Sequence, residues 1–317
     1  MKKMNNKDRG GLRNMIQRAL KKHDLIDKIF CFLNIKIGYS NIELQALEIR
    51  NKRFKHINKK YRNVIKNKDY LNNIDKNINN NIWVCWFQGI DQAPEIVKKC
   101  IKSIYKHFPN KKIHIITAEN MFEYVELPEF IIKKWKKGLI SYAHLSDILR
   151  TELLIKYGGM WIDATTYITG NIPDYIYEKN FFLLEFKSRE DITIRKNSWF
   201  IYSTKENRTL IIARDLLYAY WSKEKVLSEY FLWHMFVEMA FRKYPEDYED
   251  IYYISEEMTH FLLYNLFKPF DEKYWEQIKR FSNIHKLSYY KFFTEDTKMP
   301  KDITGTFYEK FIKGELN

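Results

Sequence analysis

The sequence is poor in cysteine, and its three cysteines form no pattern that would hold a disulfide framework or a zinc ion. Cys31, Cys85 and Cys100 are widely spaced, and no Cys-x-x-Cys pair occurs among the 317 residues. Disulfide-rich secreted domains need an even set of cysteines, and structural zinc sites need closely spaced ligands. The cysteines therefore indicate reduced thiols in a cytoplasmic setting.

Long hydrophobic runs are missing as well. No stretch of about 18 uninterrupted apolar residues occurs, so the sequence predicts no transmembrane helix. The opening stretch MKKMNNKDRGGLRNM is basic but is followed by no apolar core, which disfavours a secretory signal. Hydrophobic residues make up 45% of the chain and the mean hydropathy is −0.50, which is sufficient for a globular core.

The signature motifs of several enzyme classes are also absent. The phosphate-binding motif GxxxxGK[S/T] does not occur, and neither does the zinc-binding motif HExxH. The spacing of serine, histidine and aspartate suggests no hydrolase triad. These absences disfavour a P-loop kinase and a zinc hydrolase.

Positive charge is present in excess, but it is concentrated at one end of the chain. The net charge is +14, and residues 1–80 hold 20 Lys and Arg against 7 Asp and Glu, a net charge of +13. The remaining 237 residues therefore carry only +1. The basic segment suits contact with an anionic membrane surface, while a solvated helical extension or an oligomerisation arm explains it equally well. A nucleic-acid-binding protein is disfavoured, because no RNA- or DNA-binding signature accompanies the charge.

The hydrophobic pattern changes character near residue 81. Residues 12–77 show helical spacing and end in an asparagine-rich stretch over 72–81. The following residues predict a strand over 82–87, a helix over 94–108 that starts on a proline, and a strand over 112–120. A strand, a helix and a strand in this order form a βαβ unit, which predicts an α/β domain with a parallel sheet. The domains expected are a basic helical extension over 1–80 and an α/β domain over 81–317.

Residues 141–163 carry charged side chains at both ends of a short connection between a helix and a strand. Ser141 can cap a helix over 141–157, and the two glycines at 158 and 159 suit the turn that ends it. Asp147 and Arg150 are three residues apart and share one helix face, as a solvated ion pair would. Asp163 follows the next strand at its carboxyl end, where open α/β sheets bind their ligands.

The stretch AHLSDILRTELLIKYGGMWIDAT, residues 143–165, resembles the capsular polysaccharide synthesis glycosyltransferases and the wider set of sugar transferases with an Asp-x-Asp motif. Related arrangements occur in glycosyltransferase family 32 and in the glucosylating clostridial toxins. Residues 82–104 look like the first strand and helix of this group, and residues 229–236 and 285–292 resemble its later blocks. The resemblance implies a GT-A fold, a Rossmann-like sheet that binds a nucleotide sugar, usually with a divalent metal.

The resemblance also implies roles for individual donor-binding residues. Asp147, with Ser146 beside it in the motif, is expected to contact sugar hydroxyls. Arg150 is expected to contact the sugar or its phosphate, because a guanidinium fork matches such oxygens. Trp86, in the position of the strand-one tryptophan, is expected to stack on the base. This tryptophan and the Ser-Asp-Ile-Leu-Arg motif resemble those of enzymes that use UDP-sugars.

The expected metal motif departs from the usual pattern. Asp163 is expected to be its first carboxylate, but Thr165 stands where a second aspartate is usual, as in many capsule-type relatives. Thr165 offers a hydroxyl instead and is expected, like Lys286, to contact the donor. A Mn²⁺ or Mg²⁺ ion prefers several hard oxygen ligands, so one carboxylate predicts weaker binding. His285 is a candidate for the last metal ligand, and a structural histidine is the alternative.

Breaking the bond between a sugar and its diphosphate releases negative charge that cations must stabilise. Arg150 and Lys286 are the candidates for this task. Glu229 stands where relatives often have aspartate, and it joins Asp163 and Arg150 as a candidate catalytic residue that contacts the acceptor or the sugar. His234, on an apolar helix face, is expected to be a core histidine.

The sequence thus predicts a glycosyltransferase that moves a sugar from a nucleotide sugar to an oligosaccharide or lipid-linked glycan in capsule or other surface polysaccharide synthesis. A cytoplasmic location is expected, with peripheral contact to the inner membrane face through residues 1–80 as one interpretation. A non-catalytic scaffold with the same fold is the alternative. No nucleic acid partner is expected.

Overall fold

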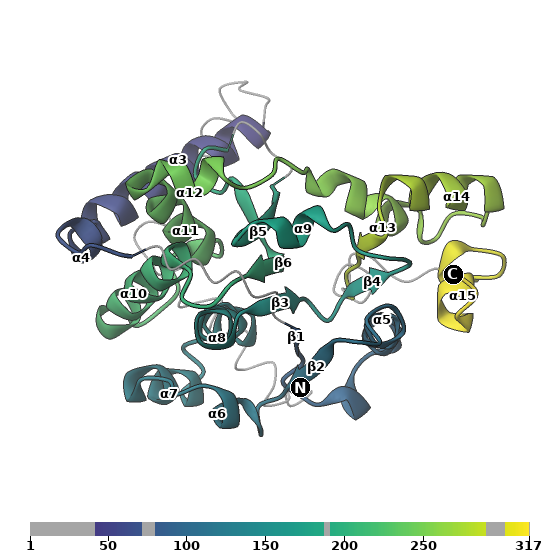
Figure 1. The fold of residues 1–317 in the computed structure, drawn as a ribbon, viewed down its shortest axis with the longest axis horizontal. Coiled ribbons are helices and arrows are strands. Elements are labelled where there is room, and N and C mark those ends of the chain that lie inside the picture. Colours follow the sequence, from purple (N-terminus) through teal and green to yellow (C-terminus); the bar gives the residue numbers. More distant parts are fainter. Residues whose placement is uncertain (1–41, 72–79, 187–190, 290–301, 317) are drawn as a thin grey trace, which may run out of the picture. The chain divides into compact units, whose positions relative to one another are not determined.

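The computed structural model describes residues 42–71, 80–186, 191–289 and 302–316 (Figure 1). The chain divides into two compact units, Met1–Ile57 and Asn58–Asn317. The part of the helical spacing that falls on residues 12–41, Cys31 and nearly all of the asparagine-rich stretch lie outside the described residues. The predicted boundary between a helical extension over 1–80 and an α/β domain over 81–317 stays a prediction.

The described part of the first unit is helical. It forms most of α3 (Ile42–Tyr61), which confirms the helical spacing over residues 42–50. Lys52 and Glu48 form an i,i+4 ion pair of 2.8 Å in which both side chains are more than half exposed. Asn51 donates a side-chain hydrogen bond of 3.0 Å to the carbonyl of Leu47. These contacts are those of a polar helix surface.

The second unit is built on a mixed five-stranded sheet with the strand order β2-β1-β3-β6-β5. Strand β1 pairs in parallel with β2 and β3, while β6 runs antiparallel to β3 and β5. The predicted α/β class is confirmed, but the sheet is only partly parallel. A second sheet pairs β4 with β7 in antiparallel fashion. The strands are β1 (Asn81–Cys85), β2 (Lys112–Ile116), β3 (Gly159–Ile162), β4 (Thr166–Ile168), β5 (Phe181–Glu185), β6 (Lys196–Ser203) and β7 (Ile284–Lys286).

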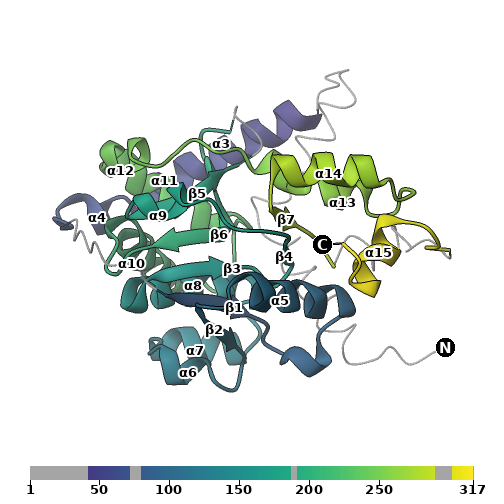
Figure 2. The same ribbon diagram turned by 45° about the vertical axis from the view of Figure 1, so that its right-hand side comes forward.

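Helices cover both faces of the main sheet (Figures 1 and 2). Helices α8, α10 and α11 pack together on one face, and α5 packs beside β4 on the other. The helices of the second unit after the end of α3 are α4 (Asn63–Lys66), α5 (Glu95–His107), α6 (Met121–Tyr124), α7 (Glu129–Lys136), α8 (Tyr142–Tyr157), α9 (Tyr175–Glu178), α10 (Arg208–Lys223), α11 (Leu232–Lys243), α12 (Pro245–Glu249), α13 (Phe261–Asn265), α14 (Glu272–Phe281) and α15 (Phe307–Lys313), with short 3-10 turns at Ile90–Gln92 and Glu256–His260.

The predicted βαβ unit is confirmed as β1, α5 and β2. The apolar stripe of α5 is buried, as its helical spacing requires; it comprises Ile96, Val97, Cys100, Ile101 and Ile104. Pro94 was predicted to be the first helical residue, but it lies in the position just before the helix, which starts at Glu95. Strand alternation sends Ile82 and Val84 into the core cluster that contains this stripe, while Trp83 and Cys85 point to the opposite face. The site is built on that opposite face.

Helix α8 begins and ends where the sequence predicted. Ser141 caps its first turn, because the serine hydroxyl accepts a hydrogen bond of 3.3 Å from the His144 amide. Gly158 and Gly159 then adopt φ angles of +63° and +99°. A Cβ atom on Gly159 would lie 2.4 Å from the carbonyl oxygen of Asn81, so only glycine allows β3 to start this close to β1. The indole of Trp83 fixes the same turn by donating to the Gly158 carbonyl at 2.9 Å.

Replacing Ser141 by Ala removes the cap of α8 and is expected to lower the free energy of unfolding by about 1 kcal/mol. Urea unfolding followed by circular dichroism measures this loss. Ser141→Asp is the matched control, because aspartate caps helices as well as serine does and should unfold at nearly the same urea concentration as the wild type. Equal stability of the alanine and aspartate variants would show that the cap contributes nothing.

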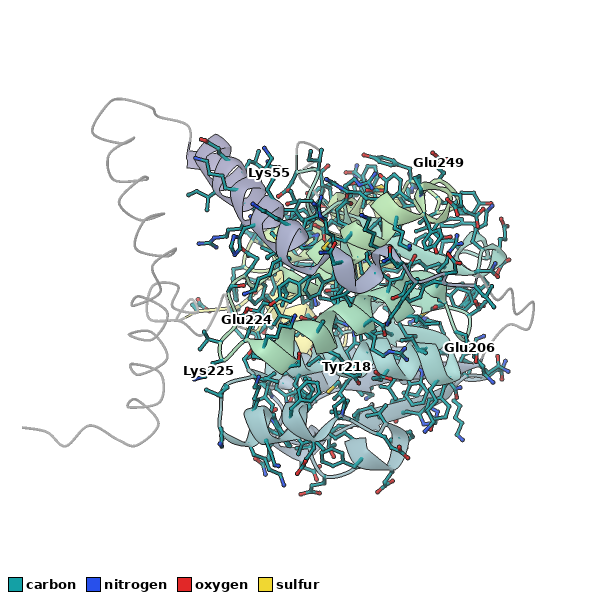
Figure 3. The ribbon with its side chains drawn as sticks, turned by 90° about the vertical axis from the view of Figure 1, so that its left-hand side faces the viewer. Lys55, Glu206, Tyr218, Glu224, Lys225 and Glu249 are labelled. Carbon is teal, nitrogen blue, oxygen red and sulfur yellow. The ribbon has the colours of Figure 1, made fainter. Side chains whose placement is uncertain are left out.

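Helix α10 is held to its neighbours by buried hydroxyl groups. Figure 3 shows Tyr218 on this helix and Glu224 just beyond its end. Tyr218 donates a hydrogen bond of 2.5 Å to Glu152 of α8. Tyr61 donates one of 2.8 Å to Glu224. The first bond ties α8, which carries the site residues, to α10, and the second ties the end of α3 to the residue after α10.

None of the helices in the described part of the chain combines the length and the apolar character that crossing a bilayer requires. The proposed membrane contact of residues 1–80 stays a prediction.

Candidate active site

The candidate site lies at the carboxyl ends of β1 and β3, two adjacent parallel strands. Alternation along β3 buries Met160 and Ile162 in the core cluster that includes α5. It therefore turns Trp161 and Asp163 toward the face covered by α8. This is the edge of the sheet at which α/β proteins bind their ligands.

Arg150 is the buried centre of the site. Its side chain is only 4% exposed, and its guanidinium lies 2.5 Å from the Asp147 carboxylate and 3.3 Å from that of Asp163. The guanidinium carbon also lies 4.9 Å from the centre of the Trp161 ring and 5.7 Å from that of Trp233. The predicted i,i+3 pair exists, but the expectation of a solvated pair is wrong, because the helix face that carries it is packed against the sheet.

Lys286 reaches the site through the small second sheet. Pairing of β4 with β7 places Thr166 opposite Lys286, just after the Asp163–Thr165 segment. The Lys286 ammonium lies 2.7 Å from Asp163 and 2.9 Å from the hydroxyl of Thr165. The amide of Leu287 also donates to the Thr165 carbonyl at 2.8 Å. Residues more than 100 positions apart are thus held together by backbone register.

Asp163 remains ionised in this setting. Burial raises its pKa, but the Lys286 and Arg150 cations and the hydrogen bonds from Lys286 and Trp161 outweigh burial and hold the pKa below its usual range. The Trp161 indole donates to Asp163 at 2.9 Å. The structure therefore brings together four of the predicted site residues, namely Asp147, Arg150, Asp163 and Lys286, with Thr165 beside them.

The amino-terminal side of the site is formed by the first turns of α8. His144 is buried, and its Nδ1 lies 3.2 Å from the second oxygen of Asp147. Asp147 is therefore held between a histidine and an arginine, with its side chain 13% exposed. Ser146 donates its hydroxyl to the Ala143 carbonyl at 2.8 Å and lies next to Asp147 on the helix.

Trp86 lies just beyond the end of β1. Its ring meets that of Tyr289 edge-on with 5.2 Å between ring centres. Its indole N–H is buried and has no hydrogen-bond partner among the described residues. Cys85, one position earlier, lies close enough to Arg150 and Asp163 for their charges to act on its thiol. Burial is the stronger effect there and raises the pKa of this thiol, so Cys85 remains protonated.

His285 does not join the site. Neighbouring residues in a strand point to opposite faces, so the side chain of His285 points away from that of Lys286. It is fully buried, lies 3.0 Å from the Thr169 hydroxyl and packs against the ring of Trp275 at 5.5 Å. The structure therefore gives His285 the packing role that was the alternative to a metal ligand.

Glu229 lies in the segment just before α11, three residues ahead of the first helical residue. Its carboxylate accepts a hydrogen bond of 3.3 Å from the Phe231 amide. The next residue, Tyr230, keeps 67% of its surface exposed. Partial desolvation, and then the Asp147 and Asp163 carboxylates, raise the pKa of Tyr230, so this largely exposed ring lies close enough to both carboxylates for their charges to act on its hydroxyl. His234 is buried on α11, as predicted for a core histidine.

The donor set does not match a divalent-cation site. Within the described residues, no group of three or more His, Cys, Asp or Glu side chains is placed to hold a metal ion. Asp163 is the only carboxylate of the motif, and two cationic side chains already contact it. A Mg²⁺ or Mn²⁺ ion prefers several hard oxygen ligands and would be repelled by these cations.

Several functional neighbours were missed by sequence reasoning. Trp161 and His144 could have been found from their spacing. Trp161 precedes Asp163 by two strand positions and His144 precedes Asp147 by three helix positions, so each shares a face with a predicted site residue. Tyr230 and Tyr289 lie outside the strands and helices, so periodicity gives no signal for them, and only the resemblance of the blocks 229–236 and 285–292 pointed to this part of the chain.

Comparison with known proteins supports the resemblance. The family model described as capsular polysaccharide synthesis protein matches residues 35–311. The chain therefore belongs to the capsular polysaccharide synthesis protein family. It is 28% identical over 108 residues to O-glycosyltransferase braB of Annulohypoxylon truncatum, a match that covers 31% of this chain and 26% of that relative. The matched part is thus about a quarter of the relative's length. A solved structure, PaToxG glycosyltransferase, aligns with a TM-score of 0.39 and 16% identity over 62% of this chain and 78% of that one.

Proposed function

We propose that this chain transfers a sugar from a nucleoside-diphosphate sugar, UDP-linked, to a hydroxyl group of a surface-glycan acceptor. The observation that carries the proposal is the network of Asp147, Arg150, Asp163 and Lys286 at the carboxyl ends of two parallel strands. Such a network offers carboxylates for sugar hydroxyls and cations for a diphosphate. Family membership supports the same reaction class.

The chemistry required is the displacement of a diphosphate from the sugar carbon C1. The bond between C1 and the diphosphate oxygen breaks, and its electron pair leaves with the diphosphate. The acceptor oxygen forms the new bond to C1, and its proton passes to a base or to water. Arg150 and Lys286 are placed to stabilise the charge that develops on the leaving group. Because both are held by carboxylates before the donor binds, they need little rearrangement in the transition state.

The remaining donor contacts follow from the position of each side chain. Trp86 lies just beyond β1, and its N–H finds no partner among the described residues, which suits a base stacked on or bonded to the indole. Asp147 would orient the sugar through its hydroxyls. Tyr230, which is largely exposed, would contact the acceptor, because an aromatic ring presents an apolar face to a sugar ring. Glu229 is adjacent to it and is the proposed base.

A thermal-shift panel of nucleotides tests the proposal. UDP, GDP, UDP-sugars and GDP-sugars are each added with and without Mn²⁺. A ligand at 100 times its dissociation constant stabilises the folded state by about 2.7 kcal/mol, so a specific donor gives a clear shift. Release of UDP is then measured by chromatography. A protein that binds UDP-sugars but never releases UDP, with any glycan acceptor, would be a scaffold rather than a transferase.

Replacing Asp163 by Asn is expected to lower UDP release by about 10²-fold, because the cations lose the charge that positions them. Asp250→Asn is the matched control, since Asp250 pairs with Lys179 at 2.6 Å on another part of the surface. Steady-state rates of both variants are compared after circular dichroism confirms folding. An unchanged rate in the Asp163 variant would remove Asp163 from the chemistry.

A further inference from the structure

The Lys286 ammonium occupies the place that a metal ion would take in an Asp-x-Asp site. It bridges Asp163 and Thr165, the first and third residues of the motif, at 2.7 and 2.9 Å. These lengths are those of hydrogen bonds from an ammonium group. The oxygens of Asp163 and Thr165 therefore contact a cation, and that cation is the Lys286 side chain rather than a bound metal ion.

The position of this ammonium is fixed by the backbone. Lys286 lies in β7 opposite Thr166, and its neighbour Leu287 is bonded to Thr165. The Lys286 side chain is only 17% exposed, and its ammonium lies 5.5 Å from the centre of the Trp199 ring. The long lysine side chain is therefore confined, rather than free to leave the motif for solvent.

Asp163 has little capacity left for a metal. A carboxylate offers about four acceptor positions. One oxygen already accepts from Arg150 at 3.3 Å and from Trp161 at 2.9 Å, and the other accepts from Lys286. A divalent ion at the remaining position would lie against two cationic groups. The charges thus oppose metal binding as long as Lys286 stays in place.

We propose that Lys286 replaces the divalent cation of this site, so that the nucleoside diphosphate is bound and its departure is assisted without a metal ion. The inference rests on the proposed function. An ammonium has three N–H donors, and Asp163 and Thr165 take two of them. The third is available to the diphosphate oxygen that receives the electron pair when the bond to C1 breaks. Arg150 supplies the second cation of the pair.

The first measurement is Mn²⁺ binding by electron paramagnetic resonance on the full chain, with no nucleotide present. We expect no Mn²⁺ site in the wild type. In Lys286→Ala we expect a site to appear, because Asp163 and Thr165 lose their cation. Lys179→Ala is the control, since it also breaks a lysine–aspartate pair of 2.6 Å but lies outside the motif. A wild-type site that Asp163→Ala abolishes would overturn the proposal, and this readout does not depend on activity.

The second measurement is UDP binding and UDP release in the presence of EDTA. Neither is expected to change in the wild type by more than twofold, whereas Lys286→Ala should weaken UDP binding at least tenfold and regain part of it with Mn²⁺. Loss of wild-type UDP binding on chelation, restored by Mn²⁺, would sink the proposal. If UDP does not bind under any condition, the proposed function fails, while the Mn²⁺ result still decides whether Lys286 keeps metal out of the motif.

Discussion

Replacing Arg150 by Met is expected to lower sugar transfer by about 10³-fold and the free energy of unfolding by about 3–5 kcal/mol. On the proposed function, the loss of activity follows from removing a cation that would stabilise the departing diphosphate. The loss of stability follows because Arg150 is only 4% exposed and neutralises the charges of Asp147 and Asp163, which would be left without this partner. Methionine fills a similar volume between Trp161 and Trp233, so a cavity is not the cause. Urea unfolding and UDP release measure the two effects.

A double variant separates the two consequences of losing Arg150. Adding Asp147→Asn to Arg150→Met removes one of the uncompensated carboxylates, so stability should partly return while activity stays low. Arg242→Met is the control, because Arg242 is 42% exposed and its partner Glu238, although buried, keeps an ion pair of 2.8 Å with Arg195, so the change should cost less than about 1 kcal/mol. Full activity in the double variant would show that the guanidinium has only a structural role.

The stability of the folded chain is expected to fall by about 2.5 kcal/mol between pH 7.5 and pH 4.5 because of His285 alone. Burial, aided by the nearby Lys279 charge, lowers the pKa of this histidine to about 3. In the unfolded chain the pKa of a histidine is about 6.5, so below that pH the unfolded state binds a proton that the folded state excludes. The contribution of neutral His285 is therefore present above about pH 6.5 and is lost as the pH falls toward 3.

His285→Gln tests this origin, because glutamine can still bond to the Thr169 hydroxyl but does not titrate. The free energy of unfolding is measured in urea at several pH values for both proteins. The difference between them should change with pH by the amount given above. His107→Gln is the control, since His107 is only half-buried on α5. Parallel pH profiles for the wild type and His285→Gln would contradict the assignment.

The sequence predicted those parts of the site that depend only on residues close together in the chain. The cap at Ser141, the helix after it and the two glycines follow from side-chain chemistry and backbone freedom, and the structure confirms each. The three-residue spacing of Asp147 and Arg150 also predicted their contact. It could not reveal their burial, which depends on the sheet beneath α8.

The pairing of strands that are far apart in the sequence was harder to predict. Strand β6 pairs with both β3 and β5, yet no prediction covered it, and its antiparallel direction makes the sheet mixed. Strands β4 and β7 contain three residues each, which is too short for alternation to mark them. Lys286 and His285 entered only through the resemblance. Which of the two faces Asp163 is decided by strand register, and a shift of one residue would exchange them.

The pairing of β4 with β7 also bears on the order of events during synthesis. Asp163 and Thr165 leave the ribosome long before residues 284–287, which supply the lysine and the backbone bond that completes the motif. A nascent chain that has folded its main sheet still lacks this half of the charge balance. On the proposed function, binding of the nucleoside diphosphate would therefore wait until residues 284–287, close to the end of the chain, have been translated and paired with β4.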